Sequence, residues 1–108
     1  MSANDVIAVA TFVPRPGQEE LLETVLRTAV QKVHQEPGCL RYALHSISRG
    51  GTGMVIIEHW ESADALTTHG RAEAFAELAS RFDELLAKPL EVVLLEPLPE
   101  GDSALGKL

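Results

Sequence analysis

Imidazole is the side chain that changes charge near neutral pH in its unperturbed state, and this 108-residue chain has four histidines. His69 is the strongest candidate for chemistry, because it ends a short predicted helix immediately before Gly70, where side chains often face a cleft. His34 lies near the end of the first predicted helix, where a cation complements the helix dipole, and we expect it at the surface. The sequence therefore predicts a functional role for His69.

A second group of candidates shares one face of a predicted β-hairpin: Tyr42, Met54, Glu58 and Trp60. A carboxylate in apolar and aromatic surroundings loses its hydration, which suits it to proton transfer or to orienting a histidine. The alternative for Glu58 is a structural ion pair with a cation such as Arg41, because burying an unpaired charge is costly. Aromatic side chains also fill ordinary cores, so Trp60 and Tyr42 fit either a ligand-binding wall or simple packing.

The remaining motifs favour structural roles. The glycine-rich segment 50–53 lies between two predicted strands, so it is a hairpin turn rather than a phosphate-binding loop. If the hairpin is centred in this segment, His45 and His59 fall opposite each other on the other sheet face. Two imidazoles are fewer ligands than closed metal sites use, so we predict no metal site and keep metal dependence through this pair as a minor alternative. Cys39 has no adjacent basic partner and is expected to be an inert apolar residue.

The elements that must position these residues follow from hydrophobic periodicity and from turn residues. Apolar residues at alternating positions predict strands over 6–13, 39–49, 54–61 and 90–95. A 3.6-residue repeat predicts one helix between Pro16–Gly17 and Pro37–Gly38. After a short helical turn begun by Ser62 and a break at Gly70, a second apolar stripe predicts another helix over 75–86.

The order strand, helix, strand, strand, helix, strand is that of an α+β, ferredoxin-like βαββαβ domain. Two helices would cover one face of an antiparallel sheet. We assign residues 1–97 to this single domain and 98–108 to a C-terminal tail.

Both faces of the predicted sheet are apolar. In the first strand Ala8 and Ala10 alternate with Ile7 and Val9, and the last strand shows the same pattern. A sheet with helices on one face usually has a polar opposite face when the protein is a monomer. An exposed apolar face marks an interface, so the sequence predicts a homodimer in which two sheets pack face to face.

Composition narrows the classes of partner and location. Nine Lys plus Arg against sixteen Asp plus Glu give a net charge of −7 and a pI near 5.0, which disfavours binding to nucleic acid or to an anionic membrane. One cysteine excludes an intrachain disulfide. The sequence shows neither a basic segment followed by an apolar leader nor an apolar run of the ~20 residues that span a bilayer. We therefore expect a cytoplasmic protein that binds neither membranes nor nucleic acid.

Three segments together resemble a known family: VATFVPRPG at 9–17, EPGCLRYALH at 36–45 and IEHWESADALTTH at 57–69. In this order they are similar to the antibiotic biosynthesis monooxygenase superfamily, and most of all to its small quinol monooxygenase branch, over residues 6–97. The resemblance implies a dimeric α+β barrel with one pocket per subunit between sheet and helices. It also implies oxidation of an aromatic quinol or a polycyclic phenol with O2 as co-substrate, without flavin, haem or metal.

The resemblance gives the candidate residues specific roles. A base deprotonates the quinol, the resulting anion passes one electron to O2, and the radical pair recombines in a dry, aromatic-lined pocket. On this reading His69 is the base or proton shuttle, and Glu58 orients either His69 or the substrate. Substrate contacts are expected from Trp60, Tyr42, Phe75 and Met54.

Two departures from the family pattern keep alternatives open. Many relatives carry a Ser/Thr-Pro-His segment shortly after the family histidine, whereas this chain has RAEAF at 71–75, so one pocket histidine is expected to be absent. Asn4 precedes the first strand and no histidine follows His69, which disfavours the haem-degrading branch. The alternatives are an isomerase of a small metabolite that uses the same His and Glu on this scaffold, and a non-catalytic dimer that binds a small ligand.

Overall fold

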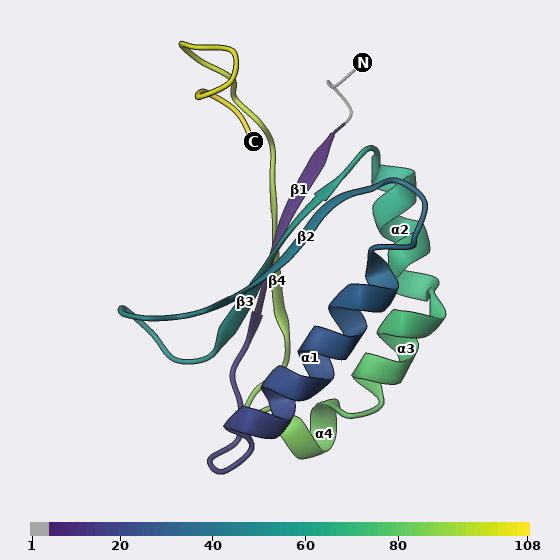
Figure 1. Ribbon diagram of the computed structural model, residues 1–108, viewed down its shortest axis with the longest axis vertical. Coiled ribbons are helices and arrows are strands. Elements are labelled where there is room, and N and C mark those ends of the chain that lie inside the picture. The colour runs from purple at the N-terminus through teal and green to yellow at the C-terminus, as the bar shows by residue number, and fades with distance from the viewer. Residues whose placement is uncertain (1–4) are drawn as a thin grey trace.

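The computed structural model describes residues 5–108, in which a layer of helices lies on one face of a single β-sheet (Figure 1). Asn4, used above against haem degradation, lies outside the described residues. The elements in chain order are β1 (Val6–Phe12), α1 (Glu19–Val33), β2 (Cys39–Ser46), β3 (Met54–Trp60), α2 (Ala63–Arg71), α3 (Glu73–Ala79), α4 (Phe82–Leu85) and β4 (Glu91–Leu95).

The four strands form one antiparallel sheet in the order β2-β3-β1-β4. The central strands β1 and β3 pair so that Ala8 lies opposite Glu58, and β2 brings Tyr42 to the other side of Glu58. This topology confirms the predicted α+β ferredoxin-like fold. It also places Glu58 in the middle of the sheet, on the face that the helices cover.

The core lies between the helices and that face of the sheet. The apolar stripe of α1 recurs every three or four residues, and its members Leu22, Leu26, Ala29 and Val33 are buried. They pack against alternate residues of β1 and β3, including the fully enclosed Phe12, Ile56 and Trp60. Burying a large apolar side chain contributes about 1.5–3 kcal/mol, so these contacts are the main force that holds α1 to the sheet.

The second helical region is broken, contrary to the single helix predicted over 75–86. One break follows Ser80, between α3 and α4, and α4 ends at Leu85. Leu86 is extended and forms an isolated bridge with Pro14, while the Ala87 N–H donates to the Val13 carbonyl at 2.8 Å. In the sequence, the helical spacing of apolar residues extends to Leu86 because the Leu86 side chain is buried. The backbone, however, has already left the helix at this point and turned toward the sheet.

The first helix of this region begins as predicted but ends later. The Ser62 hydroxyl accepts a hydrogen bond from the Ala65 N–H at 3.1 Å and so caps α2. Gly70 does not break the helix, since α2 continues through it to Arg71. The break falls at Ala72, whose backbone is extended.

The opposite face of the sheet carries no helix (Figure 1). It presents apolar side chains, among them Val93 and Leu95 of β4, which are about half exposed. Residues 96–108 continue beyond β4 without helix or strand, and Leu98 and Leu105 are exposed there. Among residues 5–108, every helix is too short or too polar to cross a membrane.

Candidate active site

A cavity of about 240 Å³ lies between the helix-covered face of the sheet and α2, α3 and the segment that leads into β4. Its walls are mainly apolar, and four of the six predicted site residues belong to them. The lining residues are Ala10, Phe12, Tyr42, Glu58, Leu66, His69, Gly70, Phe75, Leu90 and Val92.

His69 is held in this wall by aromatic contacts and one hydrogen bond. Its ring centroid lies 4.7 Å from that of Trp60, with the two planes 30° apart. Tyr42 and Phe75 approach with ring centroids 5.3 and 5.8 Å from that of His69, both in edge-to-face geometry. His69 Nδ1 lies 2.8 Å from Oε1 of Glu36, and the residue is only 5% exposed. The ring orientation is therefore fixed on several sides.

The turn between α1 and β2 explains how Glu36 reaches His69. Gly38 has φ of +80°, and a Cβ at this position would lie 2.6 Å from the Cβ of Ala65, so the turn packs directly on α2. Ala65 and His69 are one helical turn apart on the same side of α2. Because the turn follows this side, Glu36 lies against His69 just as Gly38 lies against Ala65. Sequence patterns gave no sign of a role for Glu36, although it stands in the EPGCLRYALH segment.

Glu58 is buried in the centre of the sheet, and Trp60 Nε1 donates a hydrogen bond to its Oε1 at 2.9 Å. Burial raises the pKa of Glu58, and the negative charge of Glu36 adds to this effect, while the Trp60 hydrogen bond and His69 act against it. The alternative for Glu58, an ion pair with a cation such as Arg41, does not form among residues 5–108. The carboxylate bonded to the His69 ring is that of Glu36, not that of Glu58.

Three polar atoms of the lining have no partner within residues 5–108: Tyr42 Oη, Glu58 Oε2 and His69 Nε2. In this part of the chain, Glu36 Oε2 alone is a fully enclosed side-chain N or O atom without a hydrogen bond. The three atoms are therefore not fully enclosed, and the residues that carry them all line the cavity. Burial also raises the pKa of Tyr42 far above its usual value, so its hydroxyl stays protonated.

Two predicted substrate contacts lie elsewhere. Trp60 is fully buried behind His69 and does not belong to the cavity wall. Met54 shares the helix-covered face with Glu58, but four residues of strand separate them by roughly 13 Å. Met54 is paired with Phe12 and lines a different hollow with Pro14. Sharing a face of one strand was therefore not enough to predict a shared site.

The histidines outside the cavity have structural partners. The hairpin pairs His59 with Arg41 and His45 with Val55, so these two histidines are not opposite each other as expected. The strands pair about position 50 rather than about the middle of the glycine-rich segment. His59 Nε2 instead lies 2.9 Å from Oδ2 of Asp5. Among residues 5–108, no three His, Cys, Asp or Glu side chains gather as metal ligands would.

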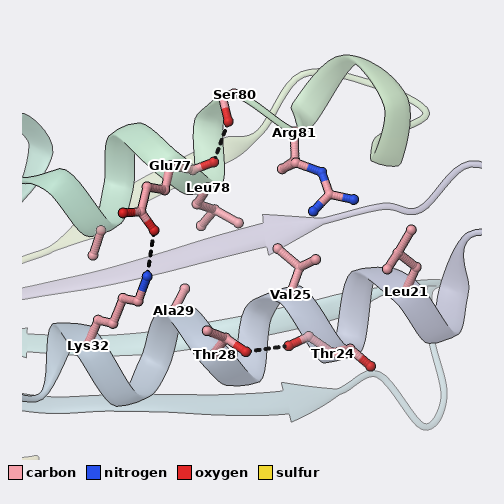
Figure 2. A pocket seen from close by; sticks show the side chains of 11 residues that line it. Leu21, Thr24, Val25, Thr28, Ala29, Lys32, Glu77, Leu78, Ser80 and Arg81 are labelled. Carbon is pink, nitrogen blue, oxygen red and sulfur yellow. Dashed lines mark hydrogen bonds and ion pairs between the residues drawn. The ribbon is translucent and has the colours of Figure 1, made fainter.

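A larger hollow, the interhelical groove, lies between α1 and α3 and has a volume of about 490 Å³. Figure 2 shows that several of its polar side chains pair with one another or with the backbone. Lys32 Nζ lies 2.5 Å from Glu77 Oε2, and the Thr28 hydroxyl donates to the Thr24 carbonyl at 3.2 Å. Ser80 donates to the Glu77 carbonyl at 2.6 Å. The groove thus has room for a ligand but no buried reactive group, so the candidate active site is the smaller cavity.

The ferredoxin-like fold agrees with the family that the sequence matches. Residues 5–81 match the family described as "Antibiotic biosynthesis monooxygenase", and the chain belongs to this family.

Individual relatives extend the match over most of the chain. Rv0793 from Mycobacterium tuberculosis is 31% identical over 98 residues, which cover 91% of this chain and 96% of that protein, and its solved structure gives a TM-score of 0.82. PA3566 from Pseudomonas aeruginosa is 30% identical with a TM-score of 0.82, covering 91% of this chain and 98% of that chain. A solved structure of an antibiotic biosynthesis monooxygenase is 28% identical with a TM-score of 0.79, covering 87% and 99% of the two chains.

Proposed function

We propose that this protein is a monooxygenase that oxidises an aromatic quinol or a related phenol with O2 and requires neither an organic cofactor nor a metal. The observation that carries the proposal is the set of unpartnered polar atoms of Tyr42, Glu58 and His69 in an apolar, aromatic cavity. An aromatic ring would fill the apolar space, and its hydroxyl groups would complete the missing hydrogen bonds.

The first chemical step falls to His69. Its Nε2 accepts the proton of a quinol hydroxyl, which raises the electron density of the ring. The quinolate passes one electron to O2, and the radical pair recombines to form a C–O bond at a ring carbon that carries hydrogen. The hydroperoxide then loses water, so a quinol plus O2 becomes a hydroxyquinone plus H2O. One oxygen atom enters the product and the other leaves as water.

Tyr42 and Glu58 would hold the substrate for this step. Because its pKa is strongly raised, the Tyr42 hydroxyl remains a donor to a substrate oxygen. Glu58 Oε2 is fixed through the Trp60 hydrogen bond to its other oxygen, so it can bind a substrate hydroxyl without moving. A ring bound against the apolar walls would displace water from them, which strengthens each of these polar contacts.

The cavity volume favours a compact substrate. At about 240 Å³ it lies at or below the lower end of the range of ~300–1,000 Å³ found for most ligand pockets. A substrate of one or two fused rings is therefore favoured over an extended polycyclic one.

We also propose that the protein works as a homodimer joined through the open face of the sheet. Val93 and Leu95 belong to β4, the edge strand next to β1. Both are apolar, yet about half of each side chain is exposed on this face. Sedimentation equilibrium should give twice the monomer mass at micromolar concentration. A monomer under these conditions would contradict the proposed assembly.

Oxygen uptake tests the function directly. The protein, freed of metal by chelation, is mixed with chemically reduced menadione, and uptake is compared with autoxidation in buffer. We expect saturable uptake and one atom of label in the hydroxyquinone when the gas is ¹⁸O2. Uptake no faster than autoxidation, across a panel of one-ring and two-ring quinols and phenols, would rule the proposal out and favour an isomerase or a binding protein on this scaffold.

A further inference from the structure

We infer that Glu36 is the positioning residue of His69: it keeps the ring proton on Nδ1, so that the lone pair of Nε2 faces the cavity. The inference rests on the proposed function, in which Nε2 is the base. Glu36 does not line the cavity. The inference gives the two carboxylates near His69 different roles, in which Glu36 orients the ring and Glu58 binds the substrate.

The contact between Glu36 and His69 is short and shielded. Oε1 and Nδ1 are 2.8 Å apart, and the two side chains are 14% and 6% exposed. The other carboxylate oxygen, Oε2, is fully enclosed and has no hydrogen-bond partner within residues 5–108. Because buried carboxylate oxygens normally have several donors, a carboxylate whose single hydrogen bond goes to His69 is unusual. That hydrogen bond is therefore the one polar interaction that can account for the burial of Glu36.

The location of the proton follows from the donor and acceptor chemistry of the contact. A carboxylate oxygen only accepts, so the hydrogen between Glu36 Oε1 and His69 Nδ1 is carried by the ring nitrogen. A neutral imidazole with hydrogen on Nδ1 has its lone pair on Nε2. Without a partner at Nδ1, either nitrogen could hold the proton, and the fraction of rings with Nε2–H could not act as a base.

The side chains around His69 keep its ring in this orientation. Trp60 covers one face of His69, while Tyr42 and Phe75 approach with their edges, so a flipped ring would have to displace aromatic side chains. Glu58 cannot replace Glu36, because its Oε1 is held by Trp60 and no hydrogen bond joins it to His69.

The backbone around Glu36 is equally constrained. The Glu36 N–H donates to the Val33 carbonyl at 2.9 Å, at the end of α1. Two residues later, the Gly38 carbonyl accepts from the Glu61 N–H at 2.9 Å, and Gly38 touches Ala65 of α2. These contacts fix the turn to both α1 and α2, so the carboxylate is presented to His69 by a rigid segment. Rigid support is what a positioning residue requires.

The test reads the tautomer of His69 directly. Multiple-bond ¹H–¹⁵N spectra of the ring distinguish a protonated, pyrrole-like nitrogen from a bare, pyridine-like one. At a pH where the ring is neutral, we expect Nδ1 to be pyrrole-like and Nε2 pyridine-like in the unaltered protein. In Glu36→Gln and Glu36→Ala, both nitrogens should move toward averaged shifts or exchange character. Glu36→Asp, which keeps the carboxylate, should restore part of the original pattern.

A matched control is Glu20→Gln, which neutralises an exposed carboxylate in the first turn of α1 and should leave the ring spectrum unchanged. Backbone amide spectra establish that each variant is folded. An Nε2–H tautomer in the unaltered protein, or an unchanged tautomer in both Glu36→Gln and Glu36→Ala, would overturn the inference.

Kinetics give a second reading that separates this inference from the proposed function. With an active quinol, Glu36→Gln should lower kcat by about 10- to 100-fold with little change in KM, as losses of orienting partners usually do, and should shift the pH profile of kcat. If no quinol or phenol is turned over, the proposed function fails, while the ring spectra still decide whether Glu36 sets the tautomer.

Discussion

The interhelical groove and the His69 cavity are hollows of opposite character. The groove has about twice the volume, about 490 Å³ against about 240 Å³. Lys32 and Glu77 of the groove are half exposed and paired with each other (Figure 2), and the exposed Arg81 pairs with Glu84. The cavity instead contains Glu58 and His69, which are almost fully buried and each have one polar atom left free.

The difference shows that buried polar groups without a protein partner indicate an active site better than the volume of a hollow does. In a solvent-exposed ion pair such as that of Lys32 and Glu77, the two charges already bind each other and water. Such a pair contributes little to the binding of a ligand. A polar atom that no protein group satisfies, on a buried residue of a largely apolar cavity wall, is open to a hydrogen bond from a substrate. Glu58 and His69 each have such an atom, so the smaller hollow is the one prepared for a substrate.

The largest effect is predicted for His69→Ala. Loss of a general base usually costs about 100-fold or more, so kcat/KM for the best quinol should fall by at least this factor. Thr28→Val is the matched control, because it removes an exposed hydroxyl from the groove and leaves the cavity intact. Steady-state oxygen uptake measures both variants. Full turnover by His69→Ala, or an equal loss in Thr28→Val, would erase the distinction between the two hollows.

A smaller effect on activity is predicted for Glu58→Gln. The amide oxygen can still accept from Trp60, but the bond to the substrate loses its charge, so kcat/KM should fall by about 10-fold. An unchanged kcat/KM would mean that Glu58 does not contact the substrate.

The same variant has a predicted effect on stability that depends on pH. Burial raises the pKa of Glu58 in the folded protein above its ordinary value of 4.5, so the folded state binds the proton more tightly than the unfolded chain. The free energy of unfolding contributed by this group must then fall as pH rises above 4.5 and through the folded pKa. Glutamine cannot ionise and shows no such fall.

Urea unfolding at about pH 5 and about pH 8 checks this sign. The free energy of unfolding of Glu58→Gln relative to the unaltered protein should be higher at the upper pH than at the lower one. A difference that shrinks or reverses with rising pH would show that Glu58 is not held in a desolvated site.

The smallest effect is predicted for Lys32→Met in the groove. Its ion pair with Glu77 is solvent-exposed, and exposed pairs often contribute nothing measurable. We expect kcat/KM and the urea midpoint to stay within experimental error of the unaltered protein. A clear loss of activity would move the functional site toward the interhelical groove.

Local patterns predicted most of the fold. Alternating apolar residues and the glycine-rich turn located the strands, and Ser62 correctly marked the start of α2. The break after Ser80 was missed because buried side chains kept the helical period up to Leu86 while the backbone turned away. The predicted register of the hairpin was wrong because several glycines in the turn make more than one turn centre sterically acceptable.

The site was predicted only in part, because contacts between distant segments leave little trace in local pattern. Tyr42, Glu58, His69 and Phe75 do meet at one cavity. Glu36 lies 33 residues before His69 and reaches it through the packing of Gly38 on α2, which no periodicity in the sequence reveals.

The most direct test of the central claim is to map where a ligand binds. Menadione, the stable oxidised form of the proposed probe, is titrated into ¹⁵N-labelled protein while backbone amide shifts are followed. The largest shifts are expected at Gly70, Phe75 and Val92, around the His69 cavity. Shifts concentrated at Thr24, Thr28 and Lys32, or saturable binding that leaves the cavity residues unmoved, would contradict the assignment of the active site.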